Sequence, residues 1–149
     1  MSEARDTVDL NGSYRFKVDA KGRVSLPAKF RKYLSEDLVV TLDLAGKYLM
    51  VFADQDSFND WVQSVLESKF GTFNPTNEEQ LMWRSALKGR SFDVQADTAG
   101  RILLPADLRK QAGIEKEAVL VGNRGYFEVW NAQSRDEMVE KIDFSSLLS

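Results

Sequence analysis

The sequence of 149 residues contains neither cysteine nor histidine. Without cysteine there is no disulfide framework, thiol nucleophile or thiolate zinc site. Without histidine, no mechanism that needs an imidazole base is possible. The lack of cysteine fits a reducing cytoplasm.

Long hydrophobic segments are also missing. The longest apolar runs, such as Leu38–Leu42, fall far short of the roughly 20 residues that span a bilayer. The polar, acidic start from Met1 to Gly12 lacks the pattern of a signal peptide. We therefore expect a soluble cytoplasmic protein that does not enter the membrane, with one domain or two small units sharing a core.

Charge is unevenly distributed along the chain. The net charge is −3, but residues 15–32 hold seven basic residues and a single acid, Asp19, for a local charge of +6. Residues 54–83 carry −5 and residues 136–149 carry −3. A strongly positive local field suits an anionic partner, although a solvated basic face explains the run equally well on this observation alone.

An internal repeat is the strongest pattern in the sequence. Residues 19–32 align without gaps on residues 97–110, and eight of the fourteen positions are identical. At the same offset, Tyr48 and Val51 align with Tyr126 and Val129. Each copy therefore spans roughly forty residues, the size of one supersecondary unit.

The copies each predict a β-hairpin, a short helix and two further strands. Apolar side chains alternate with Arg15 and Lys17 over residues 14–18, the period of a half-buried strand. Asp19 can accept backbone hydrogen bonds in the turn that follows, and Gly22 allows a positive φ there. Pro27 suits a helix start, which predicts a helix over residues 27–34 and strands over 38–42 and 48–52.

Helices are predicted between and after the copies. Apolar residues at helical spacing predict a helix over residues 57–70. Thr76 with Glu79 has the spacing of a capping box, which predicts a second helix to about Lys88. Ser134 with Glu137 repeats this spacing before a short terminal helix.

The first turn has the composition of a nucleic-acid contact. If the two strands on either side of this turn pair as a hairpin, four cations lie on its outer face or in the turn: Arg15, Lys17, Lys21 and Arg23. A two-stranded ribbon fits the major groove of B-DNA, which is about 12 Å wide, and arginine can bind both phosphates and guanine edges. The alternative is that Arg23 pairs with Asp19 to hold the turn, and Arg101 has the same alternative.

The doubled D-x-x-G-R-(V/I)-x-L-P-A signature resembles the SpoVT/AbrB-type swapped-hairpin DNA-binding domain. Two copies joined by a helical segment resemble the MraZ family of bacterial transcriptional regulators. The resemblance implies a mainly β fold with short helices (α+β), in which the repeats interlock into a pseudo-symmetric β-barrel. It implies ring-like homo-oligomers that bind double-stranded DNA at short direct repeats, upstream of the family's own cell-division and cell-wall operon. It also implies a location in the cytoplasm and nucleoid.

On this resemblance, Lys21, Arg23 and Arg101 occupy the DNA-contacting positions of the motif. The turns themselves are held by four structural residues, Asp19, Gly22, Asp97 and Gly100. The expected organisation has five parts: an acidic extension over residues 1–12, repeat 1 over 13–56, a helical linker over 57–90, repeat 2 over 91–134, and a C-terminal helix and tail over 135–149. The extension has no counterpart in the resemblance, and we expect a disordered tail there.

The two copies differ in charge. Lys21 is matched by Ala99, Arg15 by Asp93, and residues 93–110 carry no net charge. We therefore expect the first hairpin to supply most of the phosphate neutralisation. The second is expected to be a subunit contact that includes Leu103.

Two other functions are compatible with parts of the sequence. Asp97-Thr98-Ala99-Gly100 superficially resembles the loop of aspartic proteases, but the neighbouring cations would keep both carboxylates ionised. Single swapped-hairpin domains also act as antitoxins, which bind a toxin and their own promoter, although their chains are shorter. No nucleotide loop, metal cluster or cofactor motif is evident, so we expect no cofactor and no enzymatic activity.

Overall fold

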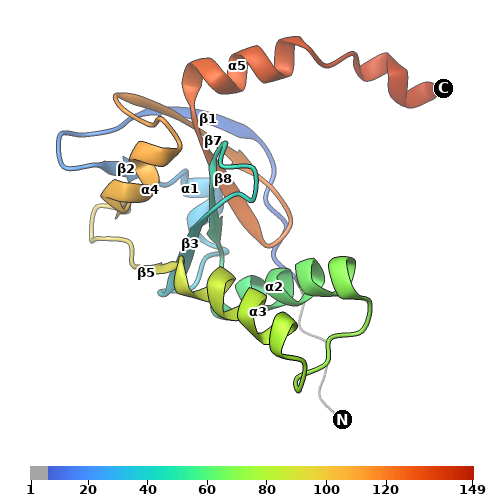
Figure 1. Cartoon of the computed structure of the whole chain (residues 1–149). Helices are drawn as coiled ribbons and strands as arrows, with labels where there is room; N and C mark the ends of the chain where they lie inside the picture. Colours follow the sequence, from blue (N-terminus) through green and yellow to red (C-terminus); the bar gives the residue numbers. More distant parts are fainter. Residues whose placement is uncertain (1–6) are drawn as a thin grey trace.

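The computed structural model describes residues 7–149 and divides the strands between two sheets (Figure 1). A six-stranded antiparallel sheet has the order β1-β7-β8-β4-β3-β5, and a two-stranded sheet pairs β2 with β6. The strands are β1 (Ser13–Lys17), β2 (Arg23–Ser25), β3 (Leu38–Leu42), β4 (Leu49–Phe52), β5 (Phe92–Val94), β6 (Arg101–Leu103), β7 (Glu117–Gly122) and β8 (Tyr126–Asn131). The helices are α1 (Ala28–Arg31), α2 (Gln55–Phe70), α3 (Glu78–Gly89), α4 (Ala106–Gln111), α5 (Ala132–Glu140) and a terminal 3-10 helix, η1 (Phe144–Leu148).

The two repeats exchange strands across an approximate two-fold axis. β1 of the first repeat pairs with β7 of the second, and β5 of the second pairs with β3 of the first. The pairs β2–β6 and β4–β8 likewise join one strand from each repeat. The mainly β architecture and the interlocking of the repeats are therefore as expected.

Two details of the expected architecture are wrong. β1 and β2 do not pair with each other as a hairpin, because β1 pairs with β7 and β2 pairs with β6, both strands of the other repeat. The backbone N–H of Leu26 donates to the carbonyl of Gly100 at 2.9 Å, and that of Leu104 donates to Gly22 at 3.0 Å. These two bonds direct the chain after each turn onto the opposite copy. The sheet also does not close into a barrel, since β1 and β5 are its two separate edges.

Apolar residues on both faces of the large sheet build two cores. Val39, Met50 and Phe52 pack on one face against α2 and α3. Val40 and Val51 point to the other face, into a core shared by both repeats. Because both faces are covered, every residue of β3 and β4 is buried, without the alternation of a half-exposed strand.

The small sheet closes the shared core at the centre of the interlock. Val24 and Ile102 are opposite each other in the β2–β6 register, and they are 1% and 0% exposed. Phe30 from α1 and Leu108 from α4 are buried in the same cluster. Figure 1 shows β2 beside α1 and α4, with α2 and α3 at a distance.

The helix starts differ from those predicted. Asn77, not Thr76, caps α3 by accepting a hydrogen bond from the backbone of Gln80 at 3.0 Å. Asn131, not Ser134, caps α5 in the same way. Asparagine caps a helix as effectively as serine does. The capping-box pattern therefore predicted a start one residue from the true cap in α3 and three residues from it in α5. The helix predicted over residues 27–34 is shorter, covering only α1.

Part of the acidic extension is ordered, contrary to the expected disordered tail. Residues 1–6 lie outside the described residues. Leu10 is 3% exposed, and its backbone N–H donates to the carbonyl of Asn123 at 3.0 Å. Asp9 forms an ion pair with Arg124 at 3.0 Å. Residues 8–10 therefore close the end of the shared core beside the β7–β8 turn.

No helix within residues 7–149 combines the length and the apolar composition that crossing a membrane requires.

Shortening a side chain at the centre of the interlock should cost much of the stability. We predict that Ile102→Ala lowers the free energy of unfolding by about 2–5 kcal/mol, because a fully buried aliphatic side chain leaves a cavity. Urea unfolding followed by circular dichroism measures this. The matched control is Leu44→Ala, at a side chain that is 56% exposed, where we expect a change within about 0.5 kcal/mol. Equal losses in the two variants would show that β2–β6 is not part of the core.

Candidate nucleic-acid interface

The outward face of the β2–β6 sheet presents one arginine from each repeat. Val24 and Ile102 point inward, so the residues on either side of them point outward. Arg23 is opposite Leu103, and Ser25 is opposite Arg101. The two arginines therefore lie diagonally across a two-stranded ribbon, which we call the β2–β6 ribbon.

The first turn is organised by the carboxylate of Asp19. One oxygen, Oδ1, accepts from the backbone N–H of Lys21 at 3.0 Å and of Arg23 at 2.8 Å. The other oxygen, Oδ2, accepts from Nε of Arg23 at 2.7 Å. Gly22 has a φ of 89°, a conformation that favours glycine. The turn thus fixes the position of the Arg23 side chain at its start.

The second turn repeats this arrangement. Asp97 accepts from the backbone N–H groups of Ala99 and Arg101 and from Nε of Arg101, at 3.0, 2.9 and 3.0 Å. A terminal nitrogen of Arg101 also lies 3.9 Å from Oδ2 of Asp19, in the first turn. The two turns are therefore built in the same way, each around an aspartate that accepts hydrogen bonds from the backbone and from an arginine.

The ion pairs that hold the turns engage the two arginines to different extents. Arg23 is engaged through Nε, whereas Arg101 is engaged through both Nε and a terminal nitrogen, each 3.0 Å from Oδ2 of Asp97. Within residues 7–149, the two terminal nitrogens of Arg23 have no hydrogen-bond acceptor. The side chains of Arg23 and Arg101 remain 30% and 35% exposed. Pairing with aspartate therefore leaves the terminal nitrogens of Arg23 available to a ligand.

Both turn carboxylates are ionised at neutral pH. The hydrogen bond from the backbone N–H of Arg23 is the main cause that lowers the pKa of Asp19, to about 2. The corresponding bond from Arg101 lowers the pKa of Asp97. A proton-sharing pair of aspartates needs one carboxyl whose pKa is raised. The electrostatics of these turns are therefore unsuited to aspartic-type acid–base chemistry.

The remaining predicted cations are spread over other elements. Arg15 lies on β1, in the large sheet, where it contacts Glu117 at 2.8 Å and Asp136 at 2.9 Å. Hydrogen bonds to these two acids raise its pKa further. Lys17 is exposed at the end of β1, opposite Glu117, and Lys21 is exposed at the tip of the first turn. The expected convergence of four cations on one paired hairpin is therefore wrong, because the hairpin itself is divided between two sheets.

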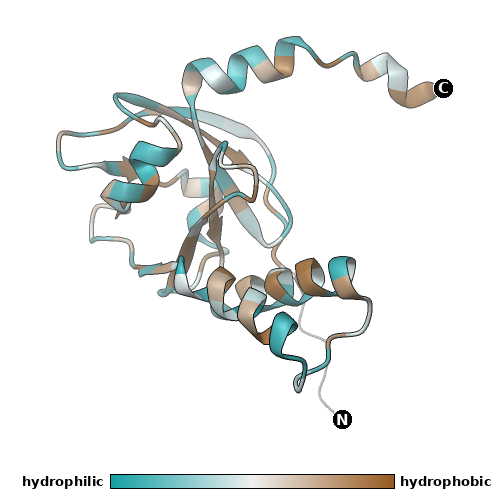
Figure 2. Ribbon diagram, viewed as in Figure 1, coloured by the Kyte–Doolittle hydropathy of each residue, from teal (hydrophilic) through white to brown (hydrophobic). Residues whose placement is uncertain are grey.

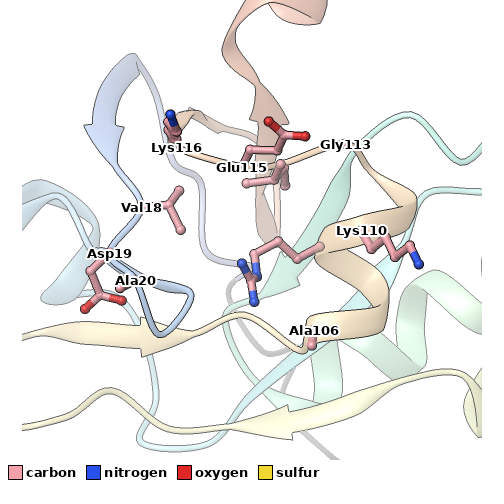
Figure 3. A pocket seen from close by; sticks show the side chains of 10 residues that line it. Val18, Asp19, Ala20, Ala106, Lys110, Gly113, Glu115 and Lys116 are labelled. Atoms are coloured by element: carbon pink, nitrogen blue, oxygen red, sulfur yellow. The ribbon is translucent and has the colours of Figure 1, made fainter.

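A cavity of about 600 Å³ lies between residues 18–20, at the start of the first turn, and residues 106–116 of α4 and the segment after it (Figure 3). Figure 3 shows Asp19 and Ala20 on one side of this space, with Lys110 and Glu115 across from them. Charged residues of both signs line the cavity: two are acidic, Asp19 and Glu115, and three are basic, Arg109, Lys110 and Lys116. In the described part of the chain, no cluster of acidic side chains has the grouping that a metal ion needs.

Two arginines that sequence reasoning left without a role lie at these turns. Arg31 and Arg109 occupy the same position in the two aligned copies. The guanidinium of Arg109 lies against Gly22, and that of Arg31 lies against Gly100. Their identity in both copies is the signal that could have identified them.

Comparison with known proteins gives a consistent result. A family model described as "MraZ protein, putative antitoxin-like" matches residues 10–81 and 89–147. The chain is 34% identical over 134 residues to a "Transcriptional regulator MraZ" from Idiomarina loihiensis, covering 87% of this chain and 84% of that protein. It is 35% identical over 140 residues to a protein of the same name from Lachnoclostridium phytofermentans, covering 91% and 94%. A third, from a Thermoanaerobacter species, is 34% identical over 136 residues, covering 91% and 90%.

Acidification should destabilise the protein through Asp19. A carboxylate with a lowered pKa adds stability above its unfolded pKa, near 4, and loses that contribution as the pH falls toward the folded value of about 2. We predict that the free energy of unfolding, measured in urea from about pH 5 to about pH 2, falls more steeply for the wild type than for Asp19→Asn. Glu140→Gln, at an exposed acid on α5, serves as the control and should retain the wild-type slope. A wild-type slope in Asp19→Asn would contradict the role of this carboxylate.

Proposed function

This chain belongs to the MraZ family of transcriptional regulators, and we propose that it binds double-stranded DNA through the β2–β6 ribbon. The observation that carries the proposal is the pair of aspartate-anchored arginines, one from each repeat, on the outward face of that ribbon. A two-stranded ribbon fits the major groove, which is about 12 Å wide. Arg23, which is held at its Nε, can present its terminal nitrogens to phosphates or to a guanine edge.

The first repeat contributes more of the binding energy in this proposal. Lys21 adds a cation at the tip of its turn, where the second turn has Ala99. Next to Arg23 on the ribbon lies Leu103, 54% exposed. Because Leu103 lies on the same face as Arg23, a contact with DNA would explain its exposure as well as the subunit contact expected from the sequence does.

The proposed target is the promoter of the protein's own cell-division and cell-wall operon, at short direct repeats. This target follows from the family resemblance stated above. Several subunits engaging adjacent repeats would raise the overall affinity without any stronger single contact. The proposal places the protein in the cytoplasm, associated with the nucleoid, and gives it no catalytic role.

Self-association into a homo-oligomer, of ring form, is part of the same proposal. Large apolar side chains are exposed on α3, where Met82 is 71% and Trp83 is 47% exposed. Others are exposed near the C-terminus, where Leu147 and Leu148 are 83% and 91% exposed. These two patches lie on well-separated parts of the molecule (Figure 2). A patch that contacts a different patch on the next copy produces rings when the rotation closes.

An antitoxin role is the alternative, and the description of the matching family model mentions it. An antitoxin of this fold would bind a small toxin protein as well as its own promoter. Isolation of the protein as a stable complex with such a toxin would favour the alternative, whereas an oligomer of this chain alone favours the regulator.

Removing the first ribbon arginine should weaken DNA binding more than removing the second. At fixed salt, we predict that Arg23→Ala lowers the affinity for the upstream DNA on the order of tenfold and reduces the log–log salt slope by about 1. Arg101→Ala should have a smaller effect. Arg124→Ala, at an exposed arginine in the β7–β8 turn, is the control and should bind like the wild type. A loss from Arg101→Ala that equals or exceeds that from Arg23→Ala would overturn the proposed asymmetry.

A charge placed in the exposed patch of α3 should dissociate the oligomer. We predict that Trp83→Lys lowers the mass measured by light scattering after size exclusion, because an apolar interface does not accommodate an unpaired charge. Leu44→Lys, at an exposed loop residue, should leave the mass unchanged. A wild-type protein that is monomeric would contradict the proposed assembly.

A further inference from the structure

We propose that Arg31 and Arg109 are positioning residues that couple the two repeats, each holding the DNA-binding turn of the opposite repeat in place. The inference rests on the proposed function of the β2–β6 ribbon. It assigns a crossed relation: Arg109, in the second repeat, supports the first turn and Arg23. Arg31, in the first repeat, supports the second turn and Arg101.

The geometry at Gly22 shows how close the support is. A Cβ atom added to Gly22 would lie 2.7, 2.8 and 2.9 Å from Cζ, one terminal nitrogen and Nε of Arg109. The three distances are nearly equal, so the guanidinium plane lies flat across the glycine rather than pointing at it. Nε of Arg109 is buried and, within residues 7–149, has no hydrogen-bond partner. This arginine therefore acts by packing of its planar group.

The second turn has the equivalent contact. A Cβ atom on Gly100 would overlap with Cζ, Nε and a terminal nitrogen of Arg31. Gly100 has a φ of 77°. Glycine is required at both turns for two reasons, because a side chain would be strained by the positive φ and would also displace the guanidinium.

Each turn glycine is also held by a backbone bond from the same opposite repeat. The carbonyl of Gly22 accepts from the N–H of Leu104 at 3.0 Å, five residues before Arg109. The carbonyl of Gly100 accepts from the N–H of Leu26 at 2.9 Å, five residues before Arg31. We call each pair of contacts, one backbone bond and one guanidinium, a cross-repeat clamp.

The clamp holds the turn residues next to those that would contact DNA. Gly22 immediately precedes Arg23, and its own N–H donates to the carbonyl of Asp19 at 2.9 Å. Loss of the guanidinium would let the turn sample other conformations, and the Asp19–Arg23 geometry would be populated less. Affinity falls in proportion to the population of the binding-competent state.

The test is a pair of crossed double-mutant cycles measured by DNA binding at fixed salt. Arg109→Lys keeps the charge but removes the planar group, and we expect it to weaken binding on the order of tenfold in an otherwise wild-type chain. In an Arg23→Ala background this effect should largely disappear, whereas in an Arg101→Ala background it should persist. Arg31→Lys should show the reverse pattern. Lys110→Ala removes a neighbouring cation from α4 and should be additive with both backgrounds.

The outcomes separate the inference from the function on which it rests. If the wild type binds no DNA, both fail. If the wild type binds and Arg23→Ala weakens binding, but Arg109→Lys binds like the wild type or is additive in both backgrounds, the positioning role is overturned and the proposed function stands. Thermal unfolding of each variant checks folding, and a general loss of stability would affect both backgrounds equally rather than in the crossed pattern.

Discussion

Pairing of β2 with β6 is the constraint on which the rest of the structure depends. Val24 and Ile102 are opposite each other there in the core. Two residues further along the chain, Leu26 and Leu104 donate backbone hydrogen bonds to the turn glycines of the opposite repeat. Neither repeat could bury its apolar face alone, because the strands that cover it belong to the other copy. The exposed side of the same strands is thereby a composite surface of both repeats.

Aspartate has a double function in this composite surface. The carboxylate of Asp19 closes the turn through backbone N–H groups and at the same time fixes Nε of Arg23. An arginine restrained in this way loses less conformational freedom when it meets a ligand, which favours affinity. The ion pair that holds the turn, one of the two sequence-based alternatives for Arg23, is thus present, and it is compatible with the proposed contact between Arg23 and DNA.

The repeat predicted much of the fold, while the strand exchange could not be read from local patterns. Period-two alternation identified β1, but its partner, β7, lies a hundred residues away in the sequence, and no short-range signal specifies that choice. The same exchange explains why Arg15 contacts Glu117 and Asp136 instead of joining Arg23. Helix starts were predicted to within a few residues, because Asn77 and Asn131 can cap as well as the neighbouring threonine and serine.

The central claim is that both strands of the β2–β6 ribbon contact DNA. Photo-cross-linking tests it most directly, with a benzophenone amino acid placed in separate variants at Ser25, at Leu103 and, as the control, at Leu44, all of which are exposed. We predict covalent adducts with the upstream DNA from the positions of Ser25 and Leu103 and none from that of Leu44. Adducts from the position of Leu44 alone, or from only one strand of the ribbon, would contradict a binding surface built by the two repeats together.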